Sequence, residues 1–327
     1  MMSIFGFTDS HPHVLKIVLS YCDIDSLIAL DHCRLTSKAV CDKFVEKIFK
    51  GLRIPALCDH LYTTAEPGVY PAQLRWSIER QVDLEGFTLT IPGYKSALFW
   101  AVDMGHADLC NLILSKGSKS MASVSTPEHA QTAPLHQAVY RQRRDIILIL
   151  LKHGADVNAR DSSYYTPLQG ACSEAHSASK AYDLASLLLD GGASIDLKPD
   201  AGGQTVLHWE AAKGRVKLVE LLIDRGADLD AVCELGRTPL HYAVGQNHPQ
   251  VVARLVTGGA NVDLVNGNGR SALIIAAKNG RREIARLLVE SGADLEVIDW
   301  DRKSVFDYVK GFRGWDFLDS TPPAAVA

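Results

Sequence analysis

The sequence has no apolar run that approaches the roughly 20 residues of a membrane-spanning helix. The longest such run, Ile146–Leu151, is ended by Lys152. The first residues also lack the uninterrupted apolar core of a secretory signal peptide, because Asp9, His11 and His13 occur there. We therefore expect neither a membrane-spanning segment nor secretion.

Basic residues are not in surplus, since 34 Lys and Arg stand against 38 Asp and Glu, for a net charge of −4. This balance disfavours a protein built to bind nucleic acid. The seven cysteines include no C-x-x-C pair, which disfavours a structural zinc site. Their odd number and wide spacing are typical of reduced thiols. We therefore expect an intracellular protein, of the cytoplasm or the nucleus, without a bound metal ion.

The common catalytic motifs are missing as well. The sequence has no phosphate-binding G-x-x-x-x-G-K-[ST] loop, no H-E-x-x-H and no G-x-S-x-G. The run from Gly267 to Ala272 imitates a dinucleotide fingerprint, but it lies where a loop leads into a helix, without a preceding parallel strand. We expect no cofactor, and we expect that the protein is not an enzyme.

What the sequence does have is a period of 33 residues. Hydrophobic residues make up 47% of the chain and charged residues 22%, which is typical of a folded protein. Short phrases of the type T-P-L-H start at residues 96, 133, 166, 205, 238, 271 and 304, and the last four starts are 33 residues apart. A second phrase of the type G-A-D-L-D follows 21 residues after most of these starts. The pattern resembles the ankyrin repeat, over roughly Lys95 to Val309.

Elementary physical chemistry predicts the same unit. Thr or Ser is a good N-cap, and Pro suits the first helical position because it has no N–H to satisfy. Small residues such as Ala138 and Ala243 let neighbouring helices approach, and a second stretch such as Leu218–Ile223 has the spacing of an amphipathic helix. Since one unit cannot bury its own apolar face, the units must stack. The predicted fold class is an all-α ankyrin-repeat solenoid of helix-turn-helix units joined by extended finger loops.

The sequence divides into four parts. Residues 95–311 hold the repeats, with extra residues near 175–181 and a truncated last unit, and residues 312–327 form a C-terminal tail. Residues 61–94 are predicted to be a helical linker or a degenerate repeat. Residues 1–60 are predicted to form a separate helical module.

The N-terminal module resembles an F-box, on the string from Pro12 to Leu30 and on Arg34-Leu-Thr-Ser-Lys-Ala-Val. This resemblance implies a helical hook that docks on a Skp-type adaptor of a cullin–RING ubiquitin ligase. The alternative is a helical cap that closes one end of the stack. If the segment is an F-box, the adaptor-docking residues are Pro12, Leu15, Val18, Leu19, Leu27, Ile28 and Leu30.

The partner-binding residues are expected on the fingers and the concave side of the inner helices. Large aromatic side chains in the fingers are typical anchors of protein interfaces. The predicted set comprises Met104, Tyr140, Tyr164, Tyr165, Trp209, Lys213, Glu234, Leu235, Arg237, Asn268, Arg270 and Trp300.

Glu210 departs from the repeat, because it stands where other units have Ala138, Ala171, Ala243 and Ala276. A buried carboxylate needs partners, so we expect a polar pocket of Glu210, His241 and Tyr242. The histidines at 136, 208 and 241 share one position of the repeat, and the ankyrin resemblance implies that they bridge the capping Thr and neighbouring backbone.

The sequence thus leaves three hypotheses for function. The first is protein recognition by the concave face, as the substrate-recognition subunit of a Skp–cullin–F-box ubiquitin ligase. The second is a plain adaptor or scaffold whose N-terminal helices are a cap. The third is an atypical enzyme with a pocket near Glu210. The identity of the bound protein is not encoded in any motif.

Overall fold

The structure is a computed structural model, and it describes residues 97–116, 132–173, 177–199 and 202–318. The chain divides into two units, Met1–Trp100 and Ala101–Ala327. The predicted F-box-like module of residues 1–60, with its adaptor-docking residues, and the segment 61–94 lie outside the described residues.

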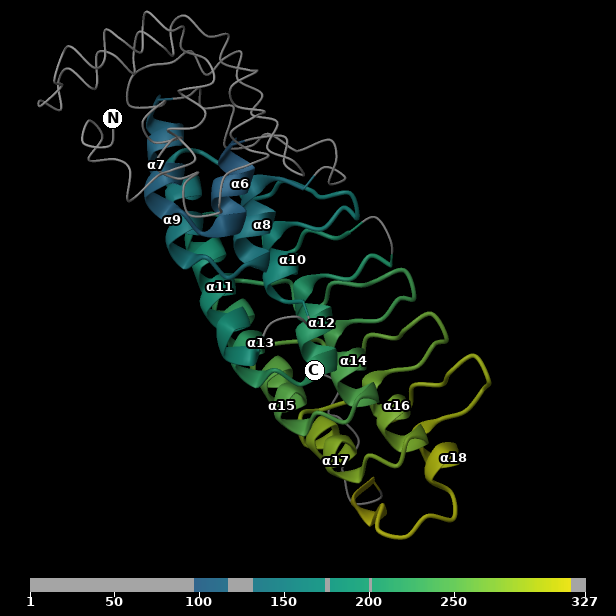
Figure 1. Ribbon diagram of the computed structural model, residues 1–327. Helices are drawn as coiled ribbons and strands as arrows, with labels where there is room; N and C mark the ends of the chain where they lie inside the picture. Colours follow the sequence, from purple (N-terminus) through teal and green to yellow (C-terminus); the bar gives the residue numbers. More distant parts are fainter. Residues whose placement is uncertain (1–96, 117–131, 174–176, 200–201, 319–327) are drawn as a thin grey trace, which may run out of the picture. The chain divides into compact units, whose positions relative to one another are not determined.

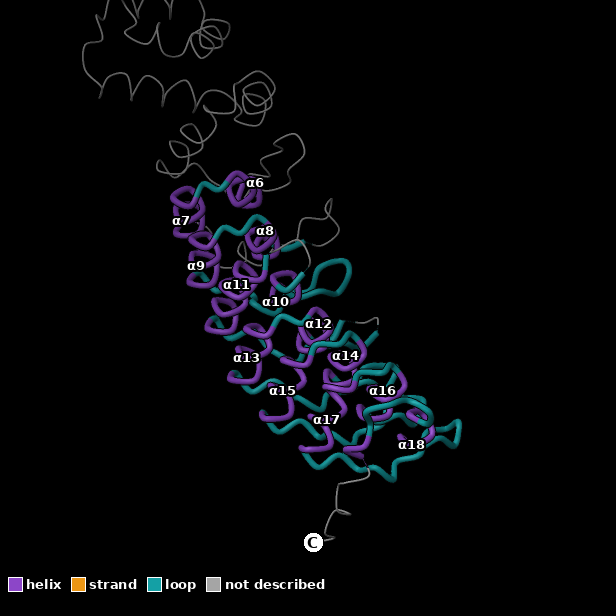
Figure 2. Tube along the Cα trace, turned by 90° about the horizontal axis from the view of Figure 1, so that it is seen from below, coloured by secondary structure: helices purple, strands orange, loops and turns teal. Residues whose placement is uncertain are grey.

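The described helices form two parallel rows, an inner row beside the fingers and an outer row behind it (Figures 1 and 2). The helix α6 (Ala97–Met104) precedes them. The inner row comprises α8 (Pro134–Tyr140), α10 (Pro167–Ala171), α12 (Val206–Lys213), α14 (Pro239–Gly245), α16 (Ala272–Lys278) and α18 (Val305–Val309). The outer row comprises α7 (Ala107–Lys116), α9 (Arg144–Lys152), α11 (Ala178–Asp190), α13 (Val216–Asp224), α15 (Pro249–Thr257) and α17 (Arg282–Glu290).

The inner helices begin where the repeated phrase predicts. Thr238 has extended backbone angles at the start of α14, and its side chain accepts a hydrogen bond from the N–H of His241. The Nδ1 atom of His241 lies 3.1 Å from the Thr238 N–H and 2.8 Å from its hydroxyl, while Nε2 lies 3.0 Å from the carbonyl oxygen of Arg270. Since Nδ1 accepts, Nε2 carries the proton and donates to the next finger. The bridging role expected for this histidine is confirmed.

Small residues and apolar side chains form a continuous core between the rows. Ala138, Ala171, Ala243 and Ala276 are fully buried on the inner helices, as the repeat predicts. The outer helices bury leucine, isoleucine and valine against them, as at Leu218, Leu222, Leu255 and Leu288. No single helix pair encloses these side chains, so the free energy of folding depends on stacking of consecutive units.

His136, on the inner helix α8, has a hydrogen-bond partner at only one of its two ring nitrogens. His136 places Nε2 2.9 Å from the carbonyl oxygen of Tyr165, but its buried Nδ1 has no hydrogen-bond partner. The reason is that the capping position of α8 is Ala133, which has no hydroxyl and makes no side-chain cap. The Nδ1 atom of His136 is therefore a buried acceptor without a donor. In the units of His208 and His241, the hydroxyl groups of Thr205 and Thr238 supply that donor.

Replacing Ala133 by Thr is expected to raise the free energy of unfolding by about 1 kcal/mol, because it adds a helix cap and a donor for His136. Thermal or chemical denaturation measures the change. Ala133→Val is the matched control, since it adds a similar shape without the hydroxyl. A Val variant as stable as the Thr variant would contradict the explanation.

The stack is irregular between α10 and α12. The helix α10 ends at Ala171, about two residues earlier than its neighbours, and the extra residues near 175–181 follow. The backbones of α10 and α12 approach each other less closely than those of α12 and α14. The carbonyl oxygen of Cys172, at the end of α10, instead accepts a hydrogen bond of 2.7 Å from Nζ of Lys213.

The last described residues cover the end of the stack. After the short helix α18, the segment leads to a 3-10 turn, η3 (Asp316–Leu318). Trp315 and Leu318 are buried, and the ring of Phe317 lies against Trp315 and beneath the guanidinium group of Arg286 from α17. Residues 312–318 thus contribute to the packed structure.

Candidate functional site

The fingers are tight turns that present side chains beside the inner helices. Four of them, residues 161–165, 233–237, 266–270 and 299–303, close with a backbone hydrogen bond from the first residue to the carbonyl oxygen of the last. The last residue of each turn immediately precedes the N-cap of an inner helix. Its side chain therefore lies next to the exposed side of that helix. We call these finger side chains and the exposed side chains of the inner helices the inner surface.

Aromatic side chains on the inner surface are fixed by contacts with one another. The rings of Tyr165 and Trp209 meet edge to face, with 5.6 Å between centroids. Trp209 Nε1 donates to Gln204 Oε1 at 2.8 Å, and Gln204 Nε2 donates to the hydroxyl of Tyr242 at 2.5 Å. The Sγ atom of Cys233 lies 3.6 Å from the same hydroxyl. These rings are half-buried or exposed, yet their positions are determined before any partner arrives.

Tyr164 occupies a position that favours glycine. Its φ angle is +61°, and the equivalent residues of other fingers are Gly203, Gly236 and Gly269, with φ between +61° and +72°. A side chain in the left-handed region is strained by about 1 kcal/mol or more. Half of the Tyr164 side chain is nevertheless exposed to solvent. Local backbone geometry therefore disfavours Tyr at this position.

Tyr164→Gly is expected to raise the free energy of unfolding by about 1 kcal/mol, since glycine adopts positive φ without strain. The same substitution is expected to weaken binding of the partner, because it removes an exposed aromatic ring. Denaturation curves and a binding assay test the two parts separately. Arg302→Gly, at φ +56° in another finger, is the control for strain alone. If both variants bind equally well, Tyr164 has no role in recognition.

Cations follow the aromatic cluster along the inner surface. The guanidinium group of Arg237 lies 5.9 Å from the ring centre of Tyr242. The ammonium groups of Lys278 and Lys303 lie 5.8 Å and 5.5 Å from the ring centre of Tyr308. Such contacts place a positive charge over the negative face of a ring. Arg237 and these two lysines have no carboxylate partner within the described part of the chain.

Arg270 differs from these three cations because carboxylates neutralise it. Its Nε atom donates to Asp299 at 2.9 Å and a terminal nitrogen donates to Asp301 at 2.6 Å. Asp299 also accepts a hydrogen bond of 2.6 Å from the Tyr308 hydroxyl. Burial raises the pKa of Asp299, but the hydrogen bonds from Tyr308 and Arg270 outweigh it and hold that pKa at about 2. Arg270 is therefore a structural link between two fingers.

The predicted pocket of Glu210, His241 and Tyr242 is wrong. Glu210 is completely buried, and its two carboxylate oxygens lie 3.5 Å from Lys213 Nζ and 3.4 Å from a terminal nitrogen of Arg215. His241 bonds to Thr238 and the next finger, and Tyr242 bonds to Gln204. The reason is geometric, because the Glu210 side chain on α12 points toward the preceding unit, where the short helix α10 leaves room for it.

Glu210 is therefore part of a buried ionic cluster at the junction between α10 and α12. Burial raises the pKa of the Glu210 carboxyl, and the nearby Lys213 and Arg215 oppose that rise. Both cations also reach the Cys172 carbonyl oxygen. The Glu210 carboxylate is fully buried and held by two cations, so it does not support the enzyme hypothesis. Lys213, predicted to bind a partner, belongs to this cluster.

The remaining predicted residues lie on exposed parts of the inner surface. Trp300 is 75% exposed, beside Gly269, and Tyr140, Met104 and Leu235 are exposed as well. Glu234 and Asn268 are exposed at finger tips. The sequence-based set missed Gln204, which links two aromatic rings, and Lys278, Lys303 and Tyr308. Lys303 lies one repeat after Arg270, and Tyr308 lies two repeats after Tyr242. The 33-residue period could therefore have identified both residues as part of the inner surface.

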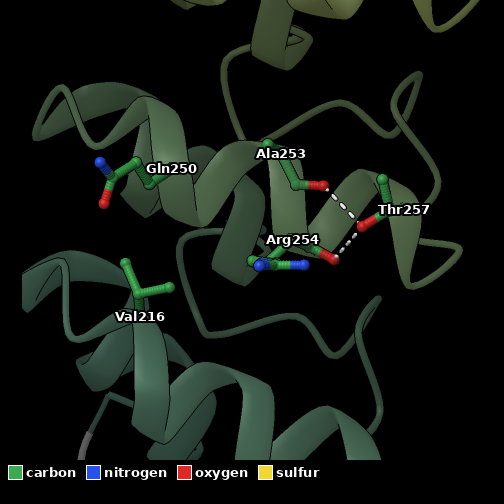
Figure 3. A pocket seen from close by; sticks show the side chains of 5 residues that line it. All are labelled: Val216, Gln250, Ala253, Arg254 and Thr257. Carbon is green, nitrogen blue, oxygen red and sulfur yellow. Dashed lines mark hydrogen bonds between the residues drawn. The ribbon is translucent and has the colours of Figure 1, made fainter.

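The described residues also include a shallow hollow of about 280 Å³ between the outer helices α13 and α15 (Figure 3). It is lined by Val216, Gln250, Ala253, Arg254 and Thr257. The Thr257 hydroxyl donates to the carbonyl oxygens of Ala253 and Arg254, and Arg254 pairs with Glu220 on α13. Because these polar groups are already engaged, the hollow offers little specific recognition.

Comparison with known families decides the classification. The model described as "Ankyrin repeats (3 copies)" matches residues 75–161 and 227–299, and the single "Ankyrin repeat" model matches residues 202–234. The chain belongs to the ankyrin repeat family. Ankyrin repeats are protein-interaction modules, so this membership makes a protein the expected partner of the inner surface.

Individual relatives share the ankyrin repeats over part of their length. The chain is 34% identical over 91 residues to "Probable E3 ubiquitin-protein ligase XBOS33" of Oryza sativa subsp. japonica, covering 28% of this chain and 16% of that protein. It is 30% identical over 150 residues to "Ankyrin repeat and SOCS box protein 6" of Homo sapiens, covering 44% of this chain and 34% of that protein. The chain thus spans about a third or less of these relatives.

A solved ankyrin structure has a similar arrangement. The ankyrin repeat domain of Bcl-3 matches with a TM-score of 0.62 and 28% identity, covering 68% of this chain and 98% of that domain. Among the described residues, no helix has the length and apolar character that crossing a membrane requires.

Proposed function

We propose that this ankyrin protein binds a partner protein through its inner surface. The observation that carries the proposal is the linked set of Tyr165, Trp209, Gln204 and Tyr242, whose half-buried or exposed rings are fixed by contacts with one another. Rings that are already ordered lose little conformational entropy on binding and suit the anchor positions of an interface. The strained Tyr164 beside them supports the same assignment, because strain is retained where a side chain has a use.

Room for a partner exists beside this cluster. The position of α10 that corresponds to Trp209 and Tyr242 in the repeat is Gly170. A Cβ atom built on Gly170 meets no heavy atom closer than 4.0 Å, where Val139 lies. A Cβ atom therefore fits at this position, and a larger side chain there is expected to add bulk to the inner surface.

The test is affinity purification with the full chain and two variants, Trp209→Ala and Gly170→Tyr. Proteins recovered with the wild type are expected to be lost with both. Gly170→Tyr guards against misfolding, because replacing a helical glycine does not weaken the helix. Tyr182→Ala, which removes an exposed ring from the outer helix α11, is the matched control and is expected to retain the partner. Recovery that is unchanged by both inner-surface variants would overturn the proposal.

The finer proposal is that the chain is the substrate-recognition subunit of a Skp–cullin–F-box ubiquitin ligase, acting in the cytoplasm or the nucleus. Support comes from the F-box-like residues between Pro12 and Leu30. One relative is named a probable E3 ubiquitin-protein ligase, and it is 34% identical to this chain over 91 residues. The buried free thiols of Cys110, Cys172 and Cys233 are consistent with a reducing compartment.

Co-purification with a Skp-type adaptor tests this role. We expect the adaptor to co-purify with the full chain. We expect a reduced yield with Leu15→Ala, which truncates one of the predicted docking side chains, and no adaptor after deletion of residues 1–60. An adaptor that still binds after the deletion contradicts the F-box assignment. A chain that never binds an adaptor, but whose repeats lose solubility without residues 1–60, supports the scaffold with an N-terminal cap instead.

A further inference from the structure

The inner surface is chemically divided along the stack. The unit that starts at residue 133 contributes the exposed side chains of Tyr140, Tyr164 and Tyr165, and the unit that starts at 205 contributes the half-buried ring of Trp209. Arg237, at the end of the unit that starts at 205, lies over the ring of Tyr242, and Lys278 and Lys303, from the unit that starts at 271, lie over the ring of Tyr308. Arg141 also lies over the Tyr140 ring in the aromatic part, but it pairs with Asp103, whereas Arg237, Lys278 and Lys303 have no carboxylate partner among the described residues.

A row of acidic groups lies at another edge of the repeats, although the fingers also carry Glu234 and the two Arg270 partners, Asp299 and Asp301. The loops that follow the outer helices carry a ladder in which each carboxylate accepts a hydrogen bond from the backbone of the next unit. Asp196 accepts from the Asp228 N–H at 3.2 Å, Asp230 from the Asn261 N–H at 2.9 Å, and Asp263 from the Asp294 N–H at 2.8 Å. In a chain of net charge −4, unpaired cations gathered on the inner surface are therefore a local feature.

We infer that the inner surface binds an extended segment of a partner protein that carries apolar or aromatic side chains in one part and carboxylates in the other. The apolar part contacts Tyr165 and Trp209, and the carboxylates contact Arg237, Lys278 and Lys303. This inference rests on the proposed function and adds the chemistry of the ligand. Charge complementarity of this kind raises association rates and excludes basic competitors.

A peptide segment fits better than another polyanion. A long nucleic acid or an anionic membrane extends beyond the cationic half, where the acidic ladder repels it. The fixed rings of Tyr165 and Trp209 offer apolar contact that neither a phosphate backbone nor a headgroup layer requires. The cations also have no built phosphate site among them, since they lie over ring faces rather than converging on one point.

The experiment is selection of random peptides displayed on phage against the full chain, followed by anisotropy measurements on the selected peptides. We expect enrichment of Asp and Glu together with Trp, Phe or Leu. The triple variant Arg237→Glu, Lys278→Glu, Lys303→Glu is expected to weaken these peptides at least tenfold. The matched control, Lys152→Glu, Lys180→Glu, Lys217→Glu, makes the same change of charge on exposed lysines of the outer helices and is expected to leave binding unchanged.

The outcomes separate the two proposals. If the selected peptides need Trp209 for binding but are uncharged or basic, the inference about ligand chemistry is overturned and the proposed function stands. Selected peptides that depend on neither Trp209 nor Gly170 contradict both. Vesicles containing phosphatidylserine and single-stranded oligothymidylate serve as further probes. If either binds more tightly than the selected peptides, and loses affinity in the cation variant, the ligand is not a protein segment.

Discussion

Replacing Glu210 by Ala is expected to lower the free energy of unfolding by about 3 kcal/mol, although Ala is the residue that other units have at this position. The carboxylate is fully buried, and it pairs with both Lys213 and Arg215. Its removal takes a buried counter-charge away from two cations at the junction between α10 and α12. Since both side chains keep some exposure, the loss falls at the lower end of the range for a broken buried ion pair.

Urea denaturation at pH 7 measures this loss. Glu210→Gln is the matched variant, because it retains the shape and one acceptor oxygen, and it is expected to lose less stability than Glu210→Ala. Adding Lys213→Met to Glu210→Ala is expected to recover part of the stability, since one unpaired charge disappears with it. An Ala variant that unfolds at a higher denaturant concentration than the wild type would show that the ionic cluster does not stabilise the junction.

Acidification from about pH 6.5 to pH 4 is expected to destabilise the repeats strongly. Burial lowers the pKa of His136, His208 and His241, and for His241 the value is about 4. The unfolded chain therefore binds protons at these side chains before the folded chain does, so stability is present above the unfolded pKa and is lost as pH falls through this window. For His241 alone the loss is on the order of 3 kcal/mol.

Two acidic side chains change this profile in the opposite direction. Burial raises the pKa of Glu210 and of Asp196, so their contribution to stability is greatest at low pH and decreases as pH rises through their folded values. These two carboxyl groups reduce the loss of stability at low pH but do not reverse it, because three histidines contribute to that loss. Asp299, with its pKa near 2, affects stability only below the window.

The chain supplies its own control for the histidine effect. In α10 the equivalent position is Gln169, whose Oε1 accepts from the Thr166 N–H at 2.7 Å and whose Nε2 donates to the Leu197 carbonyl oxygen at 2.9 Å. Gln thus makes the same pair of bonds as His241 without titrating. His241→Gln is expected to flatten the pH profile between pH 4 and 6.5 while leaving stability at pH 7 nearly unchanged. A profile as steep as that of the wild type contradicts the assignment.

The inner surface was partly predictable because it follows the repeat register. Tyr165, Trp209 and Arg237 were expected on the fingers and inner helices, and the structure places them there. The link through Gln204 was not expected, because it joins residues 38 positions apart in different units. The strain at Tyr164 was not expected either, since a φ angle depends on the turn that the whole finger adopts.

The sequence by itself determined the unit, its helix starts and the need to stack, because capping, small residues and apolar spacing act within a few positions along the chain. The ankyrin resemblance also implied the bridging role of the histidines, which His208 and His241 confirm. Only the tertiary structure decided the partners of Glu210. Its surroundings depend on the early end of α10, and therefore on how two neighbouring units meet, which no local pattern of residues specifies.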